Sequence, residues 1–446
     1  MSLMIGAVVI VIIVAGAAFF MSGKSGAKNT AQSETQEKKG SEGKETAVVQ
    51  EKAESADKSQ SAEAREKKAK TESVLENDKE KGTGENTEKI ISENQKVKNE
   101  EKVLPRILKP MKEIVDKILI CDTGSTDRTK EIIREFTAEV YDFPWKNDFS
   151  AARNFISEKV STDYWMWLDA DDVLDEENLE KLKSLKETLD PGTDVVMMEY
   201  AAGFDQSGRT TFSYFRERIM KTSRNFRWNG AVHETVIPEG NIIYSDVVIR
   251  HRKCGKGDPD RNLRIYEKML AGGETLEPRH QLYYGRELYY HQRYPETEAV
   301  LVEFLKNPPG WLENKIDACF VLGQCYRKMG EKKYALEAFL YSLTMDVPRA
   351  EICCEVGKIF LERELPRQAA YWYGQALTVP SDKKKGGFFM AECHGFVPYM
   401  QLCVCYDKMG CPEQAFFFHK KAMELKPEDP GVLYDQKYFR EKYGLS

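Results

Sequence analysis

Two clusters of acidic residues, each at the end of an apolar run, are the part of this sequence best suited to chemistry. The apolar run Ile118–Cys121 leads into Asp122–Asp127, and the run Tyr164–Leu168 leads into Asp169–Asp172. Apolar runs of this length that stop at a turn signal predict parallel strands covered on both faces. Ligands of open α/β sheets bind beyond the carboxyl ends of such strands, so we expect the acidic residues to face a ligand.

The spacing within each cluster indicates what it could bind. Asp169 and Asp171 are two residues apart, so their side chains would point to one face if the strand geometry persists, close enough to share a divalent cation. This pattern predicts a site for a metal and a diphosphate. In the first cluster, Gly124 permits a tight turn, and Ser125–Asp127 suit the cap of a helix over 128–136. Taken alone, the first cluster could also be no more than a capped helix start.

A third set of candidates follows later in the chain. His233 and Glu234 come after the glycine turn at Gly230, where a His-Glu pair could supply a metal ligand and a base. His251 ends an apolar strand predicted over 242–251. From their types and positions alone, these three could equally be ordinary residues, with His251 a hydrogen-bonded histidine at a strand end.

These segments together carry a family resemblance. The run 98–129 (KNEEKVLPRILKPMKEIVDKILICDTGSTDRT), then FSAARN at 149–154 and WMWLDADD at 165–172, resembles the family-2 type of inverting glycosyltransferases with the GT-A fold. The stretch 228–234 (WNGAVHE) resembles an element of lipopolysaccharide-core and repeat-bearing transferases of the same type. The resemblance covers 98–251 and implies transfer of a hexosyl or related group from a nucleotide-diphosphate sugar, which could be linked to UDP, GDP or dTDP.

The resemblance also implies roles for individual residues. It assigns catalysis to Glu234 as the base, with His233 as the next candidate. It places a divalent cation, Mn²⁺ or Mg²⁺, on Asp171, Asp169 and His251. The residues implied at the nucleotide sugar are Asn99, Glu100, Asp122, Thr123, Ser125, Asp127, Arg153 and Asp169. For Arg153, the alternative is a surface arginine on a packed helix.

One part of the sequence departs from the family pattern. The family's first strand is strongly apolar and sits just before the KNEE element, where this chain has the mostly polar Ile90–Val97. Burying unpaired charges in a central strand costs several kcal/mol each. We therefore expect either a short or frayed first strand, or a domain damaged at its nucleotide-binding edge.

The N-terminal residues predict an anchor and a tether. Leu3–Met21 carries no charge and is just long enough to cross a bilayer as a helix. Lys24 and Lys28 follow it, which predicts a single-pass protein with its later domains in the cytoplasm. A cleaved signal peptide and a buried helix are the rival interpretations. Ser22–Lys89 is polar and charged throughout, without aromatic residues, and predicts a solvated linker.

Beyond about Asp258 the sequence becomes periodic. Gly323, Ala335 and Phe339 recur 34 residues later as Gly357, Ala369 and Tyr373, and part of the pattern returns 80 residues on. Thirty-four is the tetratricopeptide period, and the longer offset fits two periods plus an insertion over Ser381–Glu392. The predicted organisation is a transmembrane anchor (1–22), a disordered linker (23–89), an α/β GT-A domain (90–257) and an all-α repeat domain (258–446).

The composition of the chain limits the classes of function that it could have. The chain has 446 residues, of which 41% are hydrophobic, enough for two or three domain cores. The net charge is only −6 and no basic stripe stands out, which argues against nucleic-acid binding. Ten scattered cysteines without CxxC pairs are typical of reduced core residues and favour a cytosolic location for the folded part.

We therefore expect a membrane-anchored, metal-dependent inverting glycosyltransferase. Its acceptor could be a cell-envelope glycan, a lipid or a polypeptide, and the repeats would bind that acceptor or a protein partner. The alternative is a catalytically impaired scaffold that uses the repeats for protein binding. A glycosidase with paired carboxylates is a third class, which the diphosphate-type loop disfavours.

Overall fold

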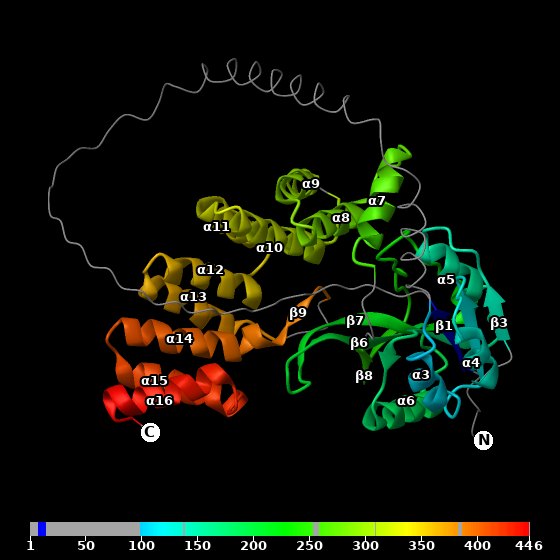
Figure 1. Cartoon of the computed structure of the whole chain (residues 1–446), viewed down its shortest axis with the longest axis horizontal. Helices are drawn as coiled ribbons and strands as arrows, with labels where there is room; N and C mark the ends of the chain where they lie inside the picture. The colour runs from blue at the N-terminus through cyan, green and yellow to red at the C-terminus, as the bar shows by residue number, and fades with distance from the viewer. Residues whose placement is uncertain are drawn as a thin grey trace, which may run out of the picture. The chain divides into compact units, whose positions relative to one another are not determined.

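The computed structural model describes residues 8–14, 99–136, 139–252, 258–307, 309–381 and 386–445. The strands of these residues form one sheet in the order β3-β2-β1-β4-β7-β6-β8-β5, and β9 pairs with β7 (Figure 1). The strands are β1 (Val8–Val14), β2 (Lys117–Asp122), β3 (Glu139–Asp142), β4 (Tyr164–Asp169), β5 (Asp172–Val173), β6 (Val195–Phe204), β7 (Thr210–Lys221), β8 (Ile242–His251) and β9 (Phe389–Met390).

The first half of the sheet is parallel and covered on both faces, as its apolar runs predict. Four helices lie along this part: α3 (Leu104–Met111), α4 (Thr129–Phe136), α5 (Phe149–Ser157) and α6 (Glu176–Thr188). In β2, Ile118 and Ile120 pack into the core that holds residues of α3, α4 and α6. Leu119 and Cys121 pack into the opposite core with α5. Because β2 and β4 both run parallel to β1, their carboxyl ends lie at one edge of the sheet, where their acidic residues follow.

Strand β1 corrects the expectation for the start of the chain. Val8–Val14 pairs in parallel with β2 on one side and with β4 on the other, so it occupies the place between the two acidic strand ends. These residues are therefore not in the membrane helix predicted over Leu3–Met21, and the rest of that range lies outside the described residues. A run of β-branched valine and isoleucine suits a strand as well as it suits a membrane helix.

Membrane-spanning helices are also absent from the rest of the described residues. None of the helices among them combines the length and the apolar character needed to cross a bilayer. The linker predicted over 23–89 and the polar segment Ile90–Val97 fall outside those residues. Strand β1 thus fills the position in the sheet for which the sequence analysis had only the polar segment Ile90–Val97.

Helices in pairs make up the remainder of the chain (Figure 1). They are α7 (Arg261–Ala271), α8 (Pro278–Tyr290), α9 (Tyr294–Lys306), α10 (Leu312–Lys328), α11 (Lys332–Tyr341), α12 (Ala350–Glu362), α13 (Pro366–Thr378), α14 (Phe396–Lys408), α15 (Pro412–Leu425) and α16 (Pro430–Tyr443). Short 3-10 helices occur at η2 (Thr222–Arg224), η3 (Ser342–Thr344) and η5 (Ala391–His394).

The recurring glycines of the periodic region lie where paired helices touch. A Cβ atom on Gly323 in α10 would lie 2.4 Å from the ring of Phe339 in α11. A Cβ on Gly357 in α12 would lie 3.0 Å from the ring of Tyr373 in α13. The same small-to-large contact therefore repeats at the same helix positions one period later, which is the packing expected of tetratricopeptide repeats.

The insertion predicted over Ser381–Glu392 has a structural role of its own. Its residues Phe389 and Met390 form β9, which pairs antiparallel with Ser213 and Phe212 of β7. A segment of the helical array is thereby joined to the sheet that carries the acidic clusters.

Candidate functional site

The first acidic cluster folds back on its own loop. The side chain of Asp122 is fully buried at the end of β2, and its Oδ1 accepts a hydrogen bond from Ser125 Oγ at 2.5 Å. The backbone N–H of Ser125 donates to the same carboxylate at 3.1 Å, and Lys130 Nζ lies 3.2 Å from its Oδ2. Gly124 makes this turn possible because it holds φ at +107°. Asp122 therefore shapes the loop that a nucleotide would meet.

The KNEE element is bonded to that loop. Asn99 Oδ1 accepts from the backbone N–H of Thr126 at 2.9 Å. The N–H of Glu100 donates to Thr129 Oγ1 at 2.9 Å, and the N–H of Glu101 donates to Asp127 Oδ2 at 3.2 Å. The structure thus brings Asn99, Glu100, Asp122, Ser125 and Asp127 to one edge of the sheet. Thr123 lies there too, buried after Asp122.

The second cluster turns sharply after its strand. Strand β4 ends at Asp169, Ala170 and Asp171 form a turn, and β5 begins at Asp172. The strand geometry that would align Asp169 with Asp171 does not persist beyond β4. The two carboxylates consequently have different neighbours, and the DxD spacing alone does not tell which residues meet.

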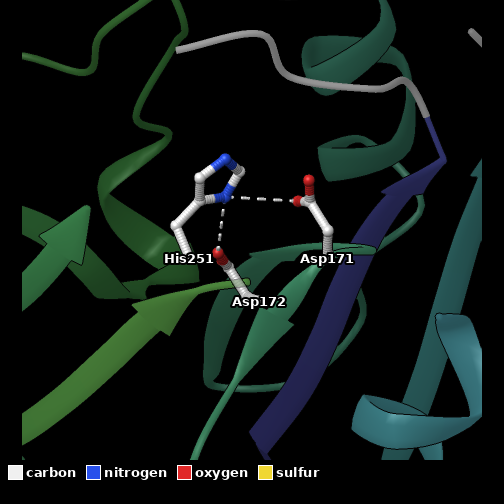
Figure 2. A group of neighbouring side chains, drawn as sticks. All are labelled: Asp171, Asp172 and His251. Carbon is white, nitrogen blue, oxygen red and sulfur yellow. Dashed lines mark ion pairs between the residues drawn. The ribbon is translucent and has the colours of Figure 1, made fainter. Parts of the chain in front are cut away.

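Asp171 meets His251 and a residue that the sequence analysis did not single out, Asp172. The Nδ1 atom of His251 lies 3.5 Å from Asp171 Oδ1 and 3.9 Å from Asp172 Oδ1, and Figure 2 shows both carboxylates turned toward the ring. All three side chains are buried, and their possible ligand atoms lie within 4.8 Å of one another. The antiparallel pairing of Asp172 with His251 in β5 and β8 sets this arrangement.

The donor set of these three residues fits a divalent cation. Both ring nitrogens of His251 and Asp172 Oδ1 are buried without a hydrogen-bond partner among the described residues. Buried polar atoms normally have partners, and two carboxylates with an imidazole are ligands that proteins offer to such ions. Burial lowers the pKa of His251, but Asp171 and Asp172 outweigh it and raise that pKa to about 10.

Arg218 holds the carboxylate oxygen of Asp172 that does not face His251. Its Nη1 donates to Asp172 Oδ2 at 3.1 Å, and neither side chain is exposed to solvent. The guanidinium lies over the rings of Trp167, at 3.8 Å, and Tyr200, at 4.5 Å. Burial alone would raise the pKa of Asp172, but the charges of Arg218 and His251 lower it. Asp172 is thus held as a carboxylate with one oxygen facing His251.

Arg153 joins Asp169 to Glu234. Its Nε donates to Glu234 Oε1 at 2.6 Å, and its Nη2 donates to Asp169 Oδ1 at 2.8 Å. The guanidinium carbon lies 4.6 Å from the ring centroid of Trp167 and 4.7 Å from that of Trp228. Arg153 is therefore not a surface arginine, because both acidic partners and both indole rings enclose it.

The pKa values of the two carboxylates that Arg153 holds are shifted in opposite directions. Burial raises the pKa of Glu234, but Arg153 and then Arg216 outweigh it, so the pKa lies below its ordinary value. The pKa of Asp169 is raised, because burial and the nearby Asp172 and Asp171 exceed the opposing effect of Arg153. Glu234 is consequently ionised at neutral pH.

The helix of Arg153 also holds the loop that carries Glu234. Asp148 caps α5 by accepting from the N–H of Ala151 at 2.9 Å. Asn154 then bonds both backbone groups of Trp228, accepting from its N–H and donating to its carbonyl, each at 2.9 Å. The FSAARN and WNGAVHE segments thus form one unit around the carboxylate of Glu234.

Comparison with known proteins identifies the sheet region. The family model for Glycosyl transferase family 2 matches residues 96–249. This part of the chain is a family-2 glycosyltransferase domain.

Two relatives match part of the chain each. The SPbeta prophage-derived glycosyltransferase SunS of Bacillus subtilis (strain 168) is 25% identical over 285 residues, which are 61% of this chain and 62% of SunS. The chain thus spans less than two thirds of the length of that relative. The TPR repeat-containing protein Synpcc7942_0270 of Synechococcus elongatus is 33% identical over 140 residues, 31% of this chain and 34% of that protein.

Solved structures also resemble part of the chain. The crystal structure of MamA protein covers 42% of this chain and 88% of its own, with 17% identity and a TM-score of 0.30. The paired helices and their repeated glycine contacts agree with the predicted period, so tetratricopeptide repeats follow the family-2 domain.

Within the family-2 domain, His233 contacts the first repeat helices. Its Nε2 lies 2.9 Å from Glu287 Oε1 on α8, and its ring stacks on Tyr283 at 4.3 Å. The residue holds φ at +53°, a conformation that is uncommon outside glycine and in which histidine is enriched together with Asn and Asp. His233 thus connects the loop of Glu234 to the first repeat helices.

A small cavity of about 50 Å³ is lined by five of the predicted site residues. They are Arg153, Asp169, His233, Glu234 and His251. Two arginines that the sequence did not single out lie here as well: Arg216 lines the cavity, and Arg218 binds Asp172 beside it. Arg216 and Arg218 alternate on β7, so both face the indole of Trp167, at 4.8 Å and 3.8 Å. The Arg-x-Arg spacing on a predicted strand was the available signal, since it puts two cations on one face.

Proposed function

We propose that this protein is an inverting, metal-dependent glycosyltransferase that uses a nucleotide-diphosphate sugar. The observation that carries the proposal is the buried group Asp171, Asp172 and His251 beside the cavity where Arg153 pairs with Glu234. Both lie in a family-2 domain. The donor would carry a hexosyl or related group linked to UDP, GDP or dTDP.

The residues support an in-line displacement at the sugar. An acceptor hydroxyl attacks the anomeric carbon, the bond from that carbon to the diphosphate breaks, and the hydroxyl proton passes to a base. Glu234 is the candidate base because it is ionised and lines the cavity. Its pairing with Arg153 positions one carboxylate oxygen, which leaves Oε2 for the acceptor.

A divalent cation, Mn²⁺ or Mg²⁺, would be held by Asp171, Asp172 and His251. When bound, such an ion stabilises negative charge that develops on a departing diphosphate. Asp169, which the sequence analysis placed in the cation shell, would instead act through Arg153. Arg218 would keep Asp172 oriented toward the ion.

The alternative of an impaired scaffold is not favoured. Its main support was a first strand too polar to complete the sheet, whereas β1 pairs with both neighbours in that place. The repeats remain available for an acceptor or a protein partner. Anchoring at a membrane, with the later domains in the cytoplasm, stays a prediction from the sequence.

Donor turnover tests the proposal directly. The full chain is incubated with a panel of nucleotide sugars, with and without Mn²⁺, and release of the nucleoside diphosphate is measured. Asp171→Asn should weaken Mn²⁺-dependent donor binding and slow turnover, since a cation ligand is lost. Asp246→Asn is the matched control, because that carboxylate is 79% exposed. If no nucleotide sugar of the panel binds or is turned over, the proposal fails.

A further inference from the structure

A groove of about 630 Å³ runs between the sheet and the repeats. We call it the sheet–repeat groove. Aromatic side chains from five separate parts of the chain line it: Tyr214 and Phe215 of β7, Tyr244 of β8, Tyr283 of α8, Trp311 before α10, and Phe388 of the insertion. The volume lies in the range of sites that bind small molecules or peptide segments.

The groove adjoins the small cavity around Glu234. Tyr214, Arg216 and His233 line both spaces. A molecule in the groove would therefore lie next to the cavity that the candidate base lines.

The insertion in the repeats builds one wall of the groove. The ring of Phe388 lies 5.6 Å from that of Tyr214 and 5.3 Å from that of Phe212, and Arg286 of α8 lies 4.3 Å from it. Pairing of β9 with β7 fixes this wall to the sheet. The repeats thus contribute directly to a space that adjoins the catalytic cavity.

Most charged groups of the groove already have partners. Glu217 pairs with Arg216 at 3.0 Å, and Glu313 pairs with Arg349 at 2.7 Å. Asp317 pairs with Arg286. These pairings leave the aromatic surface as the main means of holding a ligand. The lining also holds the aliphatic side chains of Val236, Ile237 and Pro238, which suit apolar side chains better than the hydroxyl groups of a glycan.

Large apolar side chains are exposed at the margin of the groove. Ile237 is 63% exposed, Trp311 50% and Tyr244 39%. Clustered exposed apolar residues mark surfaces that bind a partner. Glu277 and Arg279 lie among them on the same lining. A lipid chain offers no group for these two charges, whereas a polypeptide carries apolar side chains together with a polar backbone.

We propose that the sheet–repeat groove binds an extended polypeptide segment of the acceptor through its apolar side chains. The inference rests on the proposed function and names its acceptor class. A neighbouring serine or threonine of that segment would enter the cavity. Its hydroxyl oxygen would form the bond to the anomeric carbon, the diphosphate would leave, and the hydroxyl proton would pass to Glu234.

The test measures binding of short synthetic peptides of randomised sequence, each with one serine or threonine, to the full chain. Ile237→Glu places a charge on the exposed margin, and Leu433→Glu, at a residue of α16 that is 52% exposed, is the matched control. The bound peptides should be rich in aromatic and aliphatic residues. Ile237→Glu should weaken their binding by about tenfold or more, and Leu433→Glu by less than about twofold.

Glycan arrays and phospholipid vesicles are tested with the same variants. The proposal is overturned if no peptide binds, if both variants weaken binding equally, or if Ile237→Glu abolishes binding to glycans or vesicles instead. Turnover of the nucleotide-sugar panel separates the two proposals. Turnover without peptide binding removes the groove assignment alone, and peptide binding sensitive to Ile237→Glu without any turnover removes the transferase function alone.

Discussion

Arg153 holds Glu234 by a hydrogen bond of 2.6 Å from its Nε, although 81 residues separate the two in the chain. The other end of the same guanidinium binds Asp169, so one buried cation sets the positions of two carboxylates from different segments. This relationship determines the charge of Glu234 and the shape of the cavity that it lines.

Arg153→Ala should strongly destabilise the protein. The substitution leaves Asp169 and Glu234 buried without their cation, which typically costs about 3–5 kcal/mol. The free energy of unfolding from urea titration measures the effect. Arg227→Ala is the control, because Arg227 pairs with Glu158 where both side chains are more than half exposed, and such pairs contribute about 1 kcal/mol or less. Equal losses in the two variants would contradict a structural role for the buried pairing.

Glu234→Gln should separate chemistry from binding. The amide keeps the size and polarity of the side chain but cannot accept a proton, so turnover should fall by about two to four orders of magnitude. Donor affinity, measured by calorimetry with Mn²⁺, should stay close to that of the wild type. Wild-type transfer by this variant would point to another base, with His233 the next to test. Loss of Mn²⁺-dependent donor binding would instead place Glu234 at the cation.

The pH profile of transfer should reflect the arginines around Glu234. Because its pKa is lowered, the carboxylate stays ionised as pH falls past the ordinary value of 4.5, and loses its charge only below it. The acid limb of kcat/KM should therefore lie below that pH. Arg216→Gln removes one of the lowering charges and should move the limb upward. An acid limb well above pH 4.5 that Arg216→Gln leaves in place would assign it to a different group.

Local pattern was sufficient to predict the framework of the site. The apolar runs before Asp122 and Asp169 are strands covered on both faces, and the periodic glycines lie at the contacts of paired helices. Both predictions depend on neighbours close in sequence, or on a period repeated along it. The family resemblance placed Asp171 and His251 in one cation site, and their side chains lie 3.5 Å apart.

The remaining contacts depend on register and on distant segments, which one sequence does not reveal. The turn at Ala170 separates Asp169 from Asp171, and the pairing of β5 with β8 brings in Asp172 instead. His233 binds Glu287 of α8, a residue 54 positions away, and this contact joins its loop to the repeats. The first strand was sought next to the KNEE element, whereas it lies far upstream in the chain.

Removal of residues 1–21 should abolish cooperative unfolding. Strand β1 lies between β2 and β4, so its loss leaves the facing edges of two buried strands without partners. An unpaired buried backbone group costs about as much free energy as a lost hydrogen bond. Here all the backbone hydrogen bonds that β1 makes with its two neighbours would be lost. A chain that begins near Ile90 would also lack β1, so we expect that it does not fold on its own.

Removal of residues 30–80 is the matched control for that deletion. This stretch has too few apolar residues to add to a core, so the shortened chain should keep its transition in urea and its affinity for the donor. The chain without residues 1–21 should show a broad, non-cooperative change and no donor binding. If it instead unfolds cooperatively and binds donor like the wild type, β1 is not needed for the sheet. The apolar segment would then be free to act as the membrane helix that its composition predicts.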